Sequence, residues 1–274
     1  MISEIGELAR RNRLLNELGD DVLAELLSGA SVVELRHKAR IHERRTAVDH
    51  AYFPVDCVIS WIGEMRDGKC AEVMTFGCEG MAGVAAAFDA TQGAISSVVQ
   101  HPGRAIRVDA QHFKAVLSEH RSAGIVMYRY ASSLMNIMAQ TSACSRLHDL
   151  SERCAKWLLS MHDRVPGDAL PIDQQLLADM LGARRQSVSV TTSMLQDAGL
   201  IKRKRSRTIV VDRAGLERAA CECYAIIACE GVPDGRVVET EDGVRSQART
   251  WFRETYGKHG THYRTDGTDG PSAS

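Results

Sequence analysis

Residues 170–212 carry the pattern that most restricts the fold of this chain, two short helical segments joined at a glycine and followed by a basic hairpin. Asp173 can cap the first helix, because a short carboxylate accepts hydrogen bonds from the free N–H groups of a first turn. Gly182 can end it in the left-handed conformation that glycine tolerates. The apolar residues that recur between them at helical spacing are Leu176, Leu177, Met180 and Leu181.

The second helix is predicted to begin a few residues after Gly182. Its expected buried face is formed by Val188, Met194 and Leu195, and the small side chain of Ala178 lets the two helices cross closely. This arrangement is typical of a helix-turn-helix, whose second helix lies in the major groove of DNA. We therefore expect this segment to bind double-stranded DNA.

Polar and basic side chains gather at the start of that second helix and on the hairpin. We expect Arg185, Gln186 and Ser189 to read base edges, since arginine bonds guanine and glutamine bonds adenine in bidentate fashion. The residues expected to contact the DNA backbone are Arg184, Ser187, Thr191, Lys202, Arg203, Lys204, Arg205 and Arg207. From 182 to 213 there are eight basic and two acidic residues, an excess of six positive charges that suits phosphates. A winged helix that binds protein through a solvated basic face is the weaker alternative.

The chain as a whole has 274 residues, 44% of them apolar and 25% charged, with a formal net charge of −1. This length allows two domains with cores of their own. No apolar run is long enough to span a bilayer and the first residues lack a secretory signal, so we expect a cytoplasmic protein without a membrane partner. The eight cysteines at irregular spacing predict reduced thiols rather than a disulfide framework.

Short β-rich runs replace the helical pattern between residues 31 and 109. They are SVVELR, AYFPVDCVISWIG, AEVMTFG, ISSVVQ and RAIRVD, separated by Gly, Pro, Asp and His. This density of strands and turns predicts a compact antiparallel β-roll or barrel. An amphipathic helical segment at 14–27 precedes the roll and helices follow it, so the chain is predicted to be of the α+β class.

A long helix is predicted after the roll, most clearly over 123–145. One stripe of residues recurs along it at intervals of three and four, and we interpret this stripe as the dimer face: Met127, Tyr130, Leu134, Ile137, Met138 and Thr141. Such a stripe either packs on its own domain or pairs with its copy as a short coiled coil. Because helix-turn-helix modules commonly read two half-sites as dimers, we expect a homodimer.

These patterns predict four parts of the chain. They are a β-roll sensor domain at 10–122, the long helix and a following helix at 123–165, a winged helix-turn-helix at 168–229, and a disordered tail at 230–274. The helix after the long one is expected to be capped at Asp149 or Ser151. The run VPGD at 165–168 breaks the chain before the DNA-binding domain. The tail has few core-forming residues.

This order of parts resembles the Crp/Fnr transcription regulators over roughly residues 10–225. The resemblance is most specific in AQTSACSRLHDLSERCAKWLL, LADMLGARRQSVSVTTSMLQDAGLI and TIVVDRAGLERAACECY, and the last two are similar to a subgroup that ends in Cys-Glu-Cys-Tyr. It implies a homodimeric transcription regulator with a cyclic-nucleotide-binding-like sensor domain, a partly palindromic promoter site and a contact with RNA polymerase. It also implies base-reading positions for Arg185 and Gln186, although Val190 stands where many members carry a further arginine.

The sensor segment departs from the cyclic-nucleotide-binding members of that family. Those members have a Gly-Glu pair for the ribose and a later arginine for the phosphate, whereas here Val84 follows Gly83 and no arginine occurs from 77 to 99. Since a buried cyclic phosphate needs a compensating cation or dense hydrogen bonding, we do not expect cyclic AMP in the usual pose. Glu79, which lies between the glycines at 77 and 80 of this segment, is interpreted as a surface residue or a turn former. No cofactor is predicted, and the signal is left open.

Three cysteines lie close together near the end of the winged domain, Cys221, Cys223 and Cys229. They could hold a soft metal or form a redox switch. The spacing of the first two lacks the two-residue gap usual in structural zinc sites, so ordinary packing is the stronger expectation and no metal is predicted. Cys144 and Cys154 are expected to serve as small apolar residues. His148 is expected to be solvated or to cap a helix.

No catalytic residue is predicted, because the sequence lacks a nucleophile elbow and a glycine-rich phosphate loop with its lysine. The alternative to a regulator is a small-barrel metal enzyme of the cupin type with an appended DNA-binding domain. Such an enzyme needs clustered histidines and a carboxylate inside the barrel. His37, His42 and His50 are near one another but form no tight ligand motif, so we expect a regulator and not an enzyme.

Overall fold

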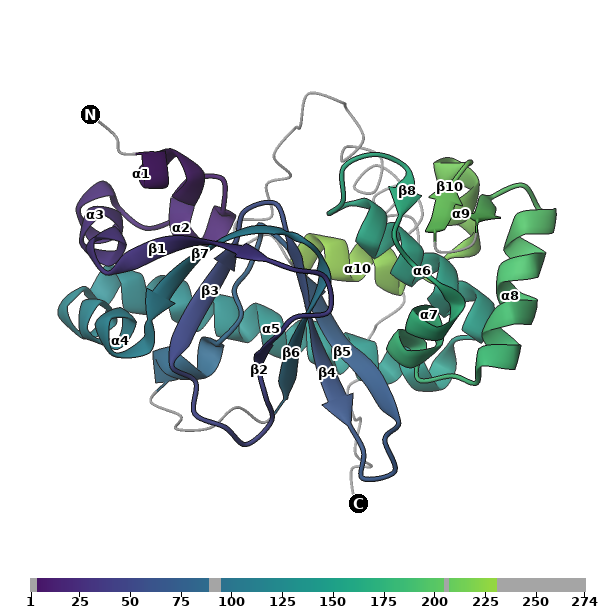
Figure 1. Cartoon of the computed structure of the whole chain (residues 1–274), viewed down its shortest axis with the longest axis horizontal. Coiled ribbons are helices and arrows are strands. Elements are labelled where there is room, and N and C mark those ends of the chain that lie inside the picture. Colours follow the sequence, from purple (N-terminus) through teal and green to yellow (C-terminus); the bar gives the residue numbers. More distant parts are fainter. Residues whose placement is uncertain (1–3, 89–94, 205–206, 231–274) are drawn as a thin grey trace, which may run out of the picture.

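The fold is α+β, as predicted, with an N-terminal pair of antiparallel sheets, a long helix and a C-terminal helical domain with a small sheet (Figure 1). The computed structural model describes residues 4–88, 95–204 and 207–230. The predicted tail beyond residue 230 lies outside the described residues. Within the described ranges, no helix combines the length and the hydropathy needed to cross a membrane.

Three short helices open the chain, where the sequence predicted one segment at 14–27. They are α1 (Glu4–Ala9), α2 (Arg13–Asn16) and α3 (Asp20–Ser28). Asn12 is fully buried between the first two and caps α2 by accepting a hydrogen bond from Leu15 N. Its amide also donates to the carbonyl oxygens of Pro54 and Gly80, both at 2.9 Å. The opening helices are therefore fastened to the roll by a buried polar side chain.

The roll is built from two antiparallel sheets that share one core. The three-stranded sheet has the order β1 (Ala30–Leu35), β7 (Gly103–Asp109), β3 (His50–Pro54), and the four-stranded sheet has the order β2 (Arg40–His42), β6 (Ser96–His101), β4 (Val58–Glu64), β5 (Cys70–Phe76). Phe53 of the three-stranded sheet packs against Phe113 in the helix after β7, with ring centroids 5.7 Å apart. The five predicted β-rich runs are confirmed, whereas β2 was not predicted.

The long helix follows directly from the roll. Asp109 caps α4 (Ala110–Glu119) through the N–H groups of Gln111 and His112, and α5 (Arg121–Leu147) then runs for 27 residues along the sheets. The next helix, α6 (Leu150–His162), begins at the expected cap Asp149, whose own N–H donates to the Glu152 carboxylate at 2.9 Å. A second core lies between α6 and the C-terminal elements.

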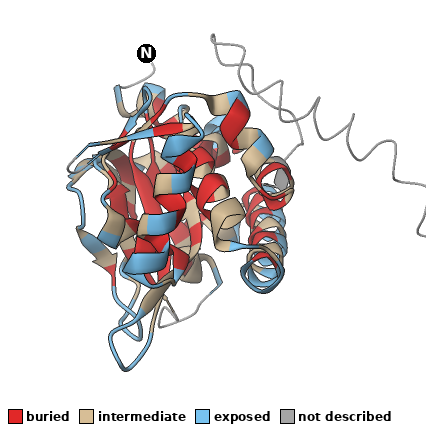
Figure 2. Ribbon diagram, turned by 90° about the vertical axis from the view of Figure 1, so that its right-hand side faces the viewer, coloured by how far each residue is buried: buried red, intermediate tan, exposed pale blue. Residues whose placement is uncertain are grey.

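The C-terminal domain contains the predicted helix pair and hairpin. Its elements are β8 (Ala169–Leu170), α7 (Gln174–Leu181), α8 (Arg185–Asp197), β9 (Ile201–Lys204), β10 (Arg207–Val210), α9 (Arg213–Ala219) and α10 (Cys223–Glu230). The three strands form an antiparallel sheet in the order β8-β10-β9. Figure 2 shows the buried residues gathered where sheets and helices face each other, with the exposed ones on the outer faces.

Candidate nucleic-acid interface

The turn between α7 and α8 is formed by the residues that the sequence singled out. The Asp173 carboxylate accepts a hydrogen bond from Leu176 N at 2.8 Å and caps α7. Gly182 ends this helix with a φ of 60°, in the left-handed region that favours glycine. Ala178 is buried, as the close crossing of two helices requires. The local geometry of a helix-turn-helix is present.

The buried face of α8 differs in one position from the prediction. Val188 and Leu195 are buried as expected, but Met194 is 60% exposed. The residues that complete the buried stripe are Thr191 and Thr192, at helical intervals from Val188 and Leu195. Met194 lies about a quarter turn away from that stripe, because successive helical residues are rotated by about 100°. It shares the outward face with Val190, which is 63% exposed.

The start of α8 presents polar side chains to the surroundings. Arg184 is the N-cap residue, and the three residues after it, 185–187, are exposed. Among the described residues, no hydrogen bond or ion pair engages the side chains of Arg184, Arg185 or Gln186. The free N–H groups of the first turn lie beside them, so this end of the helix favours anions.

Two other predicted DNA contacts are used inside the protein. The Ser189 hydroxyl is half-buried and accepts a long hydrogen bond from Gln174 Nε2 at 3.4 Å. Thr191 is 7% exposed, and its position on the inner face of α8 follows from the helical interval to Val188. Its side chain packs against the domain instead of facing a phosphate. We therefore leave Thr191 out of the interface.

The β9–β10 hairpin supplies the basic surface next to α8. Lys202, Lys204 and Arg207 are exposed, whereas Arg205 lies outside the described residues. Arg203 differs from them, since its guanidinium donates to Thr192 Oγ1 at 2.8 Å and to Ser193 Oγ at 3.3 Å. It fastens the hairpin to the second helix of the pair and is not a free cation.

The stripe predicted to be the dimer face of α5 is turned towards the chain's own core. Met127, Tyr130, Leu134 and Ile137 are buried, and Met138 packs against the same core. Thr141 is half-buried. The outer face carries a second series at intervals of three and four residues, which we call the outer seam: Ile125, Tyr128, Ser132, Met135, Ala139 and Ser142. Of the two packings considered for the predicted stripe, the structure shows packing on the chain's own core, because the more apolar stripe is the one that the core requires.

The loop at 77–83, which follows β5 and contains three glycines, is called the glycine corner here. Side chains from α5 and from the residues after α6 close it. Tyr130 Oη accepts a hydrogen bond from Met81 N at 2.9 Å and donates to Met81 O at 3.2 Å. The Glu79 carboxylate accepts the Gly77 N–H at 3.0 Å and pairs with Arg164 Nε at 2.7 Å. Glu79 is thus a turn former, as expected, but it is not a surface residue. These contacts join the corner to α5 and to Arg164, two residues beyond the end of α6.

The histidines considered for a cupin-type metal site are used elsewhere. A ring nitrogen of His37 lies 2.8 Å from the Gln100 carbonyl oxygen, and one of His42 lies 2.9 Å from the His50 carbonyl oxygen. Burial lowers the pKa of His42, which keeps that ring neutral near pH 7. In the described ranges, these three residues do not gather their donor atoms into one metal-binding group.

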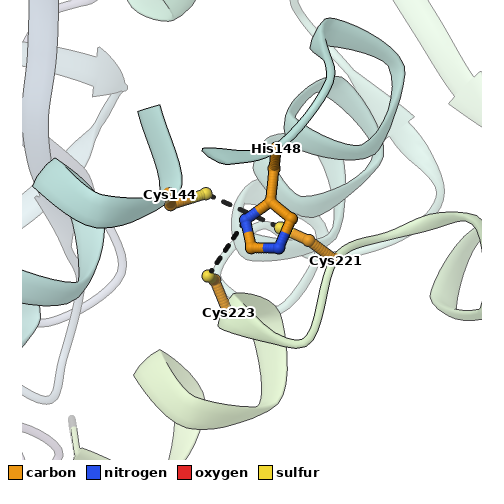
Figure 3. A group of neighbouring side chains, drawn as sticks. All are labelled: Cys144, His148, Cys221 and Cys223. Carbon is orange, nitrogen blue, oxygen red and sulfur yellow. Dashed lines mark hydrogen bonds between the residues drawn. The ribbon is translucent and has the colours of Figure 1, made fainter. Parts of the chain in front are cut away.

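Two of the cysteines considered for a soft metal, Cys221 and Cys223, lie in a group whose other members the sequence reasoning did not connect with them. Cys144, His148, Cys221 and Cys223 converge from the end of α5 and the start of α10, as Figure 3 shows. A hydrogen bond from Cys221, together with the charge of Lys156, lowers the pKa of the Cys144 thiol and favours its thiolate form. Cys144 is therefore not merely a small apolar residue. The side chain of Cys229 lies outside the described residues.

Comparisons with known proteins agree with this geometry. Residues 152–219 match the family described as the Crp-like helix-turn-helix domain. This part of the chain is a Crp-like helix-turn-helix domain. It contains α7, α8 and the hairpin, including every described residue at the proposed DNA surface. No curated protein matches the chain in sequence.

Solved structures share the whole architecture at low sequence identity. A Crp/Fnr-family regulator from Eubacterium rectale has a TM-score of 0.63 and 14% identity, with 77% of this chain and 98% of that chain covered. FixK2 from Bradyrhizobium japonicum has a TM-score of 0.60 and 14% identity, with coverages of 70% and 98%. The c-di-GMP-responsive regulator CLP from Xanthomonas campestris has a TM-score of 0.57 and 14% identity, with coverages of 70% and 99%.

The resemblance to the Crp/Fnr regulators stated from the sequence is confirmed by the domain match and by the common fold. The match to a Crp-like helix-turn-helix domain supports the predicted DNA-binding transcription regulator. The N-terminal roll shares its fold with the corresponding part of these structures. Neither comparison supports the cupin alternative.

Proposed function

We propose that the protein is a homodimeric, sequence-specific transcription regulator that reads a partly palindromic promoter site. The observation that carries the proposal is the unpartnered tip of α8, with Arg184, Arg185 and Gln186 exposed beside a basic hairpin in a Crp-like helix-turn-helix domain. A helix in the major groove uses its N-terminal residues to contact base edges.

Base reading is assigned to Arg185 and Gln186, with a smaller role for Ser189 because its hydroxyl is engaged by Gln174. Val190 lies one turn after Gln186 and is exposed, so it can contact the methyl group of a thymine. The residues proposed to bind the phosphate backbone are Arg184, Ser187, Lys202, Lys204, Arg205 and Arg207.

The dimer is proposed to form through the outer seam of α5. Tyr128 and Met135 are 69% and 67% exposed, and Ile125 is 44% exposed. Their three-and-four spacing matches the seam of a two-stranded coiled coil. The small residues between them, Ser132, Ala139 and Ser142, let two copies of the helix approach closely. Two half-sites in the DNA would then be read by two copies of α8.

The remaining parts of the function follow from this assignment. A dimer on promoter DNA acts in the cytoplasm beside RNA polymerase, and it performs no catalysis of its own. The N-terminal roll serves as the sensor, in the domain division 10–122, 123–165 and 168–229 given above. A signal changes DNA binding only through its different affinity for the binding-competent and incompetent states.

The DNA proposal is tested by selecting binding sites from random duplexes and then measuring affinity for single-base variants of the selected site. We expect salt-dependent binding of the wild type to a two-fold site. Arg185→Ala should lose about 1–3 kcal/mol of discrimination at one base position of each half-site. The matched control is Arg184→Ala, which should weaken all sequences by the same factor. Equal weakening by both variants would refute the base-reading role, and wild-type protein that selects no site would refute the function.

The dimer proposal is tested by sedimentation equilibrium. Met135→Glu places a charge in the outer seam and should convert a dimer into a monomer, because a buried unpaired charge opposes association. Met65→Glu is the control, since Met65 is 64% exposed in the turn after β4 and lies away from α5. If Met135→Glu remained a dimer of wild-type affinity, the outer seam would not be the interface.

A further inference from the structure

Four metal-binding side chains meet where α5 ends and α10 begins (Figure 3). Cys144 lies in the last turn of α5 and His148 is the residue that ends this helix. Cys221 and Cys223 lie about the start of α10, more than seventy positions later in the sequence. Their donor atoms all lie within 4.8 Å of one another.

Two distances within this group are close to those of a tetrahedral ligand set. With Zn–S bonds of about 2.3 Å and Zn–N bonds of about 2.0 Å, tetrahedral angles separate two sulfurs by about 3.8 Å and a sulfur from a nitrogen by about 3.5 Å. Cys144 Sγ lies 3.6 Å from Cys221 Sγ, and Cys223 Sγ lies 3.6 Å from His148 Nδ1. A disulfide would need its sulfurs about 2.05 Å apart.

The surroundings are those that metal-bound side chains have. His148 Nε2, the nitrogen that faces away from Cys223, lies 3.0 Å from the Glu222 carboxylate. A carboxylate in this place fixes the ring orientation and the tautomer of a metal-bound histidine. Gln140 Nε2 donates to Cys223 Sγ at 3.0 Å. All three cysteines of the group are buried, and they form a small cluster of their own apart from the two cores.

We propose that Cys144, His148, Cys221 and Cys223 bind one Zn²⁺ ion in a closed structural site. Binding releases the protons of those thiols that are still protonated and uses His148 Nδ1, leaving Nε2–H to donate to Glu222. Three thiolates and one neutral imidazole give the site a net charge of −1. Lys156 offsets this charge, since it interacts electrostatically with both Cys144 and Cys221. Soft sulfur and imidazole ligands select zinc over magnesium or calcium.

The site would tie the long helix to the end of the DNA-binding domain. Four protein ligands leave no open coordination position, which is typical of structural rather than catalytic zinc. Such a tie fixes α10 against α5 independently of the hydrophobic contacts between them. The inference concerns this chain's own metal binding and does not depend on the proposed function.

The experiment is metal analysis of the full-length protein, purified without chelators from cells grown with zinc. We expect one zinc ion per chain in the wild type and a near-complete loss in Cys223→Ser and His148→Ala. Cys70→Ser is the matched control, because Cys70 is a half-buried thiol of β5 outside the group, and it should keep its zinc.

A second measurement uses the wild-type protein, so that it does not depend on whether the variants fold. Wild-type protein is stripped with a chelator, checked by circular dichroism and titrated with Zn²⁺ and Co²⁺, the cobalt form giving the visible absorption of a tetrahedral thiolate site. Glu222→Gln should still bind zinc, but about 10–100-fold more weakly. The proposal is overturned if the stripped wild type binds no zinc. It is equally overturned if peptide mapping of protein kept under reducing conditions finds Cys144 linked to Cys221.

Discussion

The tip of α8 and the glycine corner of the roll handle their polar groups in opposite ways. Arg184, Arg185 and Gln186 at the tip engage no partner among the described residues. At the corner, Glu79 is paired with Arg164 and Tyr130 is bonded to Met81. One region leaves its polar atoms exposed, and the other uses them in contacts within the protein.

This difference predicts which substitutions affect DNA affinity and which affect the stability of the fold. Exposed, unpaired polar groups contribute little to folding and are free to bond DNA. Buried, paired groups contribute to folding because removing one partner leaves the other unsatisfied. Substitutions at the tip should therefore change affinity without changing stability, while substitutions at the corner should change stability first.

The largest expected effect is that of Glu79→Ala. It leaves the Arg164 guanidinium without its carboxylate, and both side chains are mostly buried, at 14% and 17% exposure. Loss of one partner of a buried ion pair costs about 3 kcal/mol of the free energy of unfolding, measurable by urea denaturation. Asp67→Ala, which breaks the exposed pair with Lys69, should cause no measurable change. Equal stability of the two variants would contradict the corner's role.

The two buried carboxyl groups that bond to α6 and to the residues just after it should respond to pH with opposite signs. Burial opposes ionisation of Glu79, but Arg164 holds its pKa below the usual range, so its stabilising contribution is present above about pH 4.3 and is lost as the pH falls through the folded-state pKa. Burial raises the pKa of Glu72 against hydrogen bonds from Ser60 and Trp157 Nε1. The contribution of Glu72 is therefore full below about pH 4.3 and is lost as the pH rises through its raised value.

Variants with glutamine at these positions isolate the two contributions. Relative to wild type, Glu79→Gln should lose stability at pH 7 and lose progressively less as the pH is lowered. The stability of Glu72→Gln relative to the wild type should instead increase as the pH rises. Urea denaturation at a series of pH values measures both differences. Parallel pH profiles for the two variants would show that the corner pair is not ionised as described.

A smaller loss is expected for Tyr130→Phe. The change removes one hydroxyl that both donates to and accepts from the backbone of Met81, which is fully buried. Leaving those groups unsatisfied costs about 1–2 kcal/mol. Tyr128→Phe is the control, because that side chain is 69% exposed. In thermal denaturation, the Tm of Tyr130→Phe should be lower than that of Tyr128→Phe. The reverse order would contradict the role given to the corner contacts.

The smallest effect on the protein itself is expected for Lys204→Ala on the hairpin. Its stability should match that of the wild type, since the side chain is exposed. DNA affinity should fall by a similar factor for all sequences, and the slope of log K against log salt should fall by about 0.9. Arg36→Ala, an exposed cation beyond β1, should leave both quantities unchanged. A sequence-dependent loss would assign Lys204 to base reading instead.

Local signals were sufficient for the helix-turn-helix. Asp173, Gly182 and the apolar spacing between them specify a capped helix and its end within ten residues. The β-rich runs were recognisable for the same reason, because alternation and turn residues act over short distances. The prediction placed Met194 on the buried face because it is apolar and adjacent to Leu195. The buried face is instead completed by the polar residues Thr191 and Thr192.

Contacts between distant residues could not be predicted in this way. Cys144 and Cys221 are 77 positions apart, and Glu79 and Arg164 are 85 positions apart. The spacing of Cys221 and Cys223 does not indicate that His148, at the end of α5, lies next to them. The two stripes of α5 repeat at the same intervals, so only the packing of the roll decides which one faces inward.

The two tyrosines of α5 give that helix a particular mechanical position. Tyr130 is hydrogen-bonded to the backbone of Met81. Tyr128, two residues earlier, lies on the outer seam, and its ring is tilted against that of Phe88 with a centroid distance of 6.2 Å. One turn of α5 therefore contacts the corner with one ring and, in the dimer that we propose, faces the second copy with the other. In that dimer, a rotation of α5 that breaks the contact with Met81 would also reorient Tyr128 at the interface, so both subunits would respond together.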